Sequence, residues 1–112
     1  MTRRRLIVRP AVRADILLYV RYLLEHDART AAERFPDAVD QALERLLDTP
    51  GLGAPQAFTH PKLGAMRAWQ VPGFRYMYIY YQEILGGIRV IRILHSKRNL
   101  RRIFSLKGKP MH

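Results

Sequence analysis

The chain has 112 residues, 48% of them hydrophobic, and a formal net charge of +11. This length is enough for one hydrophobic core but too short for two. The absence of cysteine excludes disulfides, thiolate metal sites and a cysteine nucleophile, and because the four histidines match no known zinc spacing we expect no metal and no cofactor.

The positive charge is concentrated in the second half of the chain. Residues 1–48 carry nine Arg against eight Asp or Glu, a balance of +1. Residues 49–112 carry eleven Lys or Arg against Glu83 alone, a balance of +10. Because a field of one sign attracts nucleic acid or an acidic protein segment, we expect a polyanionic partner.

The first predicted elements are a short strand and a helix. The apolar run at residues 6–8 is typical of a strand, and Pro10 ends it. This run is too short for a signal peptide or a membrane span, so we expect a cytoplasmic protein without membrane contacts. Apolar residues at helical spacing then predict a helix over 11–26; they are Val12, Ile16, Tyr19, Val20, Leu23 and Leu24.

A second helix is expected to begin at Thr30, because Thr30 and Glu33 have the spacing of a capping box. The helix should end near Asp48, before Pro50. Pro36 lies inside it, where the missing N–H predicts a kink or a restart. The two helices would form a hairpin.

The remaining pattern is typical of strands. Residues 49–65 are rich in Pro and Gly and predict a long connection, either functional or disordered. Three strands should follow, over residues 66–71, 75–82 and 88–95. The order β-α-α-β-β-β predicts an α+β fold, in which the helix hairpin packs on one face of a small, mainly antiparallel sheet and leaves the other face open. We expect one domain over residues 1–104 and a basic C-terminal tail over 105–112.

The strand over 75–82 is unusually rich in tyrosine. Strict alternation puts Tyr76, Tyr78 and Tyr80 on one face of the sheet. Aromatic residues suit any half-buried strand, and they also suit a platform on which exposed bases stack. The sequence leaves both interpretations open.

His95 ends the last strand, which predicts either a packing role or proton transfer. Cleavage of RNA through its own 2′-OH needs a base, an acid and cations that hold the developing charge. His95, Arg75 and Tyr78 are the candidates for these roles, although the set lacks a second clear acid or base. After His95, Lys97, Arg98, Arg101 and Arg102 are candidates for target contacts, the alternative being a solvated tail.

The element order and several motifs resemble the RelE/ParE superfamily of bacterial type II toxins. In the last matching stretch, Leu94 and His95 at a strand end are followed by Arg98 and Asn99, where the ParE pattern has Arg-Asp. The matching stretches are residues 10–15, 31–35, 75–81 and 93–99.

The resemblance implies a toxin that an antitoxin neutralises by wrapping an acidic, otherwise unfolded segment around it. We expect a hetero-oligomer in which the antitoxin lies in a groove between helix hairpin and sheet. The expected contact residues are Val12, Ile16, Phe35, Val39, Trp69 and Tyr80.

The long hairpin and the Leu94-His95 strand end favour the ParE branch, whose members inhibit DNA gyrase without being enzymes. The basic tail keeps open a RelE-like, metal-independent endoribonuclease that cleaves mRNA on the ribosome. A non-toxic nucleic-acid-binding module is a third possibility.

Overall fold

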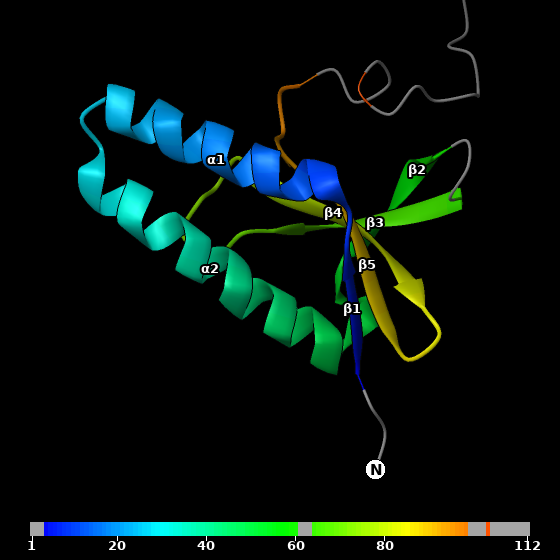
Figure 1. The fold of residues 1–112 in the computed structure, drawn as a ribbon. Coiled ribbons are helices and arrows are strands. Elements are labelled where there is room, and N and C mark those ends of the chain that lie inside the picture. The colour runs from blue at the N-terminus through cyan, green and yellow to red at the C-terminus, as the bar shows by residue number, and fades with distance from the viewer. Residues whose placement is uncertain (1–3, 61–63, 99–102, 104–112) are drawn as a thin grey trace, which may run out of the picture.

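Two helices cover one face of a five-stranded sheet (Figure 1). The computed structural model describes residues 4–60, 64–98 and 103. The elements are β1 (Arg5–Val8), α1 (Pro10–Glu25), α2 (Arg29–Asp48), the short 3-10 turn η1 (Pro50–Leu52), β2 (Ala54–His60), β3 (Gly64–Gln70), β4 (Met77–Ile84) and β5 (Gly87–His95). The strand order is β1-β5-β4-β3-β2, in which β1 runs parallel to β5 and the other pairs are antiparallel. The expected α+β arrangement of a helix hairpin on a mainly antiparallel sheet is confirmed.

Strand β2 was not expected from the sequence. Its residues 54–60 lie inside the segment that the Pro and Gly content marked as a connection, yet they pair with β3 with a register shift between Pro55 and Thr59. A proline is tolerated there because β2 is an edge strand, where a missing N–H disrupts few ladder bonds. The sheet therefore has five strands instead of four.

Helix α2 begins one residue earlier than expected and is not capped as predicted. Its N-cap residue is Ala28, with no side-chain cap hydrogen bond, so Thr30 and Glu33 form no capping box. The helix also continues through Pro36 without a restart. Phe35 and Val39 are buried on either side of this proline, and their packing offsets the lost backbone hydrogen bond.

The turn between the helices is a Schellman motif. Asp27 adopts a positive φ of 58°, the left-handed conformation that ends many helices. The Ala28 N–H donates to Leu23 O at 2.8 Å, and the Asp27 N–H donates to Leu24 O at 3.2 Å. This closure turns the chain back directly into α2 and produces the hairpin.

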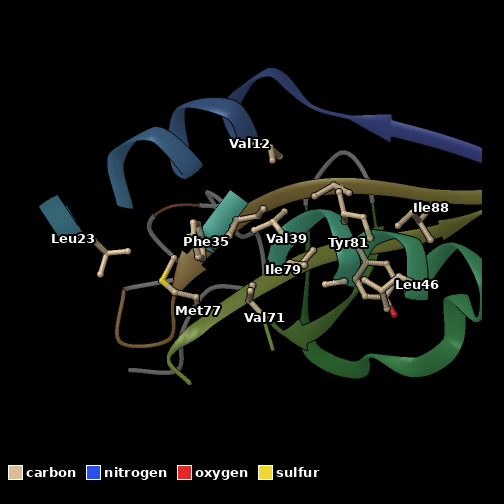
Figure 2. Packing of buried hydrophobic residues seen from close by; sticks show 14 of the residues in the cluster. Val12, Leu23, Phe35, Val39, Leu46, Val71, Met77, Ile79, Tyr81 and Ile88 are labelled. Carbon is tan, nitrogen blue, oxygen red and sulfur yellow. The ribbon is translucent and has the colours of Figure 1, made fainter. Parts of the chain in front are cut away.

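The main core lies between the helix hairpin and the sheet (Figure 2). Phe35 and Leu46 of α2 and Ile79 and Tyr81 of β4 are each 0% exposed. Strand β4 alternates between the two faces of the sheet, so Tyr80 and Tyr81 are buried on opposite faces. The register shift between Tyr80 and Tyr81 leaves Ile91 as an extra residue on the partner strand β5.

The face of the sheet away from the helices is also packed, which corrects the expected open face. A second cluster there consists of Met66, Ala68, Tyr80, Ile91 and Leu94. Tyr78 and Ile103 pack against it. Tyr80 is 3% exposed, so it offers no stacking platform for bases. Within the described residues, no helix is both long and apolar enough to cross a membrane.

Candidate functional site

A partly buried ion pair joins α1 to the end of β5. The Asp15 carboxylate accepts hydrogen bonds from Arg92 Nε at 2.8 Å and Arg92 Nη2 at 2.7 Å, and from the Ile93 N–H at 3.0 Å. The bond to Asp15 raises the pKa of Arg92, which keeps the guanidinium charged. This pair fixes the helix against the strand that ends in His95.

A pocket opens beside this ion pair. Its volume is about 260 Å³. Leu18, Tyr19 and Tyr22 of α1 line it on the helix side, and Ile93 and Leu94 of β5 line it on the sheet side. The remaining lining residues are Asp15, Met77, His95 and Arg98. The pocket therefore combines apolar walls with a few polar groups, as binding sites usually do.

The outer surface of α1 beside this pocket carries several exposed apolar side chains. Leu17, Leu18, Tyr22 and Leu24 are each at least 50% exposed. We call these four residues the α1 apolar surface. Two of its members, Leu18 and Tyr22, also line the pocket. Apolar side chains gathered in this way at a hollow are typical of a protein interaction site.

Unpaired cations lie at the same end of the sheet. Arg75, Lys97 and Arg98 are exposed, and none of them forms a salt bridge with another described residue. By contrast, Arg4 pairs with Glu44 and Asp48, and Arg67 pairs with Glu83. The three cations give this end of the molecule a positive field that no described acidic side chain neutralises.

Two of the three residues suggested for catalysis come near each other, and the third does not. His95 stacks on the Tyr76 ring at a centroid distance of 5.4 Å, and Arg75 lies near the same ring. Tyr78 instead packs against the cluster on the face away from the helices. His95 Nδ1 accepts a hydrogen bond from the Lys97 N–H at 3.1 Å, so the neutral ring carries its proton on Nε2. Among the described residues, no three His, Cys, Asp or Glu side chains gather to hold a metal ion.

The residues suggested for antitoxin contact are mostly core residues. Val12, Phe35 and Val39 are at most 1% exposed, and they fill the space in which a groove between hairpin and sheet was expected. Ile16 and Trp69 are partly buried against the same core, and Tyr80 lies in the cluster on the other face. These positions correct the expected groove, because a side chain without exposed surface has none to offer a partner.

Of the residues suggested for target contact, Lys97 and Arg98 are exposed beyond the end of β5. Arg101 and Arg102 lie outside the described residues, as does the tail over 105–112. Sequence reasoning missed the α1 apolar surface. Its signal was present, because Leu17 and Leu18 are large apolar residues outside the helical stripe that predicted the core.

One family model matches this chain, and a solved structure shares its fold. The family model described as "ParE toxin of type II toxin-antitoxin system, parDE" matches residues 6–100. A solved structure titled "Chromosomal ParDE TA system from P. aeruginosa" is similar in fold, with a TM-score of 0.65 and 12% identity, and the match covers 84% of this chain and 97% of that chain. A search of curated proteins finds no significant match.

Proposed function

Because the chain belongs to the ParE toxin family of type II toxin–antitoxin systems, we propose that it stops growth by inhibiting DNA gyrase. The observation that carries the proposal is the group of cations without a salt bridge among the described residues at the end of β5. Gyrase inhibition is the role of the ParE branch that the sequence resembles. A strongly positive surface suits a protein whose target works on DNA.

We infer that inhibition occurs by binding and not by catalysis. The suggested nuclease set is divided between the two faces of the sheet, since His95 lines the pocket beside α1 and Tyr78 packs on the opposite side. General acid–base catalysis needs its groups within hydrogen-bond reach of one reacting bond. The proposed target contacts are therefore Lys97, Arg98, Arg101 and Arg102.

The α1 apolar surface is the proposed docking site of the antitoxin. It is exposed, it adjoins a pocket, and it belongs to a chain with a net charge of +11. An acidic segment that folds on binding would gain both apolar burial and charge complementarity there. This surface replaces the groove that the sequence suggested, while Ile16 and Trp69, which keep some exposure, are further candidate contacts.

The test is inhibition of purified gyrase in a supercoiling assay. A variant in which Glu replaces Lys97, Arg101 and Arg102 should no longer inhibit supercoiling. Its affinity for the antitoxin should be unchanged. Arg98 stays unchanged in this variant because it also lines the pocket. The matched control reverses three exposed arginines of the helices, Arg13, Arg29 and Arg34, and should still inhibit. Unchanged inhibition by the first variant, or equal loss in the control, would defeat the assignment.

A further inference from the structure

Tyr76 is an exposed aromatic residue surrounded by cations. The residue is 45% exposed and lies just before β4. Arg75 Cζ is 5.2 Å and Lys97 Nζ is 5.6 Å from the centroid of its ring, both within the range of cation–π attraction. An aromatic ring and two cations therefore share one small area of surface.

Backbone hydrogen bonds hold this area in place. The Ser96 N–H donates to Tyr76 O at 2.7 Å, and the Arg98 N–H donates to His95 O at 3.0 Å. The His95 ring stacks on Tyr76 with an interplanar angle of 21° and so fixes the orientation of the tyrosine ring. A rigid aromatic ring loses little conformational entropy when a ligand stacks on it.

The chemistry of this area distinguishes it from the α1 apolar surface. A protein segment with carboxylates would use the cations but gain little from the Tyr76 ring. A nucleic acid strand brings both a negative phosphate and a base with a π face. Stacking requires that the base be unpaired and free to leave its neighbours, which is the case in a single strand.

We propose that Tyr76, Arg75 and Lys97 form a binding site for single-stranded nucleic acid. A base stacks on the exposed part of the Tyr76 ring, and a phosphate lies near the two cations. The Nε2–H of neutral His95 is a further donor at the same ring. This site goes beyond the inhibition of gyrase and shares only Lys97 with the proposed target contacts, so binding through Tyr76 and Arg75 does not depend on that proposal.

The test is fluorescence anisotropy of a labelled single-stranded oligonucleotide with the purified full-length chain over a series of salt concentrations. Arg75→Gln and Lys97→Gln should each reduce the slope of log K against log salt by about 0.7, the loss of one phosphate contact on a single strand. Tyr76→Ala should weaken binding by about 5- to 150-fold, whereas Tyr76→Phe keeps the ring and should bind like the unmodified chain.

The control is Arg45→Gln, which removes one exposed charge near the end of α2. Arg45 is next to Glu44 in the sequence, and Glu44 pairs with Arg4, the residue before β1. The first residue of β1, Arg5, is in register with Gly87 at the start of β5, whereas the proposed site is at the end of β5 beside His95. This variant should keep the full salt slope. An equal loss of slope in Arg45→Gln would overturn the proposal, because it would indicate attraction by net charge alone.

Two further results would also overturn it. One is unchanged affinity for the oligonucleotide in a Tyr76→Ala variant that circular dichroism shows to be folded. If Tyr76→Ala is unfolded, the salt slopes of Lys97→Gln and Arg75→Gln test the proposal, and unchanged slopes overturn it. The other is a loss of affinity for a labelled poly-glutamate peptide in Arg75→Gln and Lys97→Gln while the oligonucleotide still binds normally. That result would assign the site to an acidic protein segment.

Discussion

At the scale of single residues, the Tyr81 hydroxyl joins the sheet to the turn after α2. It donates to Pro50 O at 2.7 Å and accepts from the Gly53 N–H at 2.8 Å. Burial raises the pKa of Tyr81, so the hydroxyl stays protonated and can donate. Gly53 has no room for a side chain, because an added Cβ would lie 2.6 Å from the Tyr81 hydroxyl oxygen.

Tyr81→Phe should therefore be destabilising although it removes one atom. Both backbone partners would lose their bond to this hydroxyl, and leaving buried polar groups unsatisfied costs about 1–3 kcal/mol. Urea denaturation measures the free energy of unfolding. The matched control is Tyr22→Phe, which should make little difference because Tyr22 is 50% exposed. Equal stability of the two variants would show that the Tyr81 contacts contribute nothing.

Asp15→Asn tests the ion pair that positions the candidate site. The change leaves the Arg92 guanidinium, whose side chain is 25% exposed, without its charged partner. We expect a loss of about 1.5–3 kcal/mol, the range for a hydrogen bond to a charged group, because partial exposure of Arg92 moderates the cost. A double-mutant cycle with Arg92→Gln checks the origin of the loss. Purely additive effects would contradict a direct interaction.

At the scale of elements, β1 depends on a close approach to β5. Arg5 lies opposite Gly87 in the parallel pair, and a Cβ added to Gly87 would lie 1.8 Å from the Arg5 carbonyl oxygen. Gly87→Ala should therefore displace β1 and destabilise the fold by at least about 1–3 kcal/mol, as overpacking typically does. Gly51→Ala is the control, because nothing lies within 4 Å of its added Cβ. The midpoint of thermal unfolding is measured for both variants. A midpoint of Gly87→Ala equal to that of Gly51→Ala would contradict the close approach.

The α1 apolar surface gives a second prediction at this scale. Leu18→Glu should weaken binding of the cognate antitoxin by about 30-fold or more, the effect of losing an interface hot spot. The fold should survive because Leu18 is 55% exposed. Leu85→Glu is the control, since Leu85 is 90% exposed and lies in the β4–β5 turn. Isothermal titration calorimetry measures the affinity of each variant for the antitoxin. Equal affinities of Leu18→Glu and Leu85→Glu would show that the antitoxin does not bind at the α1 apolar surface.

The elements also show how far the sequence alone leads. Periodicity predicted α1, α2, β3, β4 and β5 with ends within two residues. It missed β2 because the stability of an edge strand comes from pairing with β3, and local proline and glycine content obscures that pairing. It also could not fully separate the core from the exposed surface. Leu23 and Leu24 both belong to the helical stripe predicted over 11–26, and only the packed fold reveals that the first is buried and the second exposed.

At the scale of the whole molecule, acidic side chains of the helices neutralise selected arginines and leave others free. Asp15 of α1 pairs with Arg92, and Glu44 and Asp48 of α2 pair with Arg4. Glu83, the only acid after residue 48, pairs with Arg67. The cations near Tyr76 have no comparable partner among the described residues. Positive charge from the second half of the sequence is therefore left without an acidic partner at this end of the sheet.

The measurement that tests the central claim most directly is the order in which DNA and protein synthesis fail after this chain alone is induced in bacteria. Incorporation of labelled thymidine and of a labelled amino acid would be followed through the first minutes. If the chain inhibits gyrase, thymidine incorporation falls first while amino acid incorporation continues. If amino acid incorporation falls first, the target lies in translation and gyrase inhibition is contradicted.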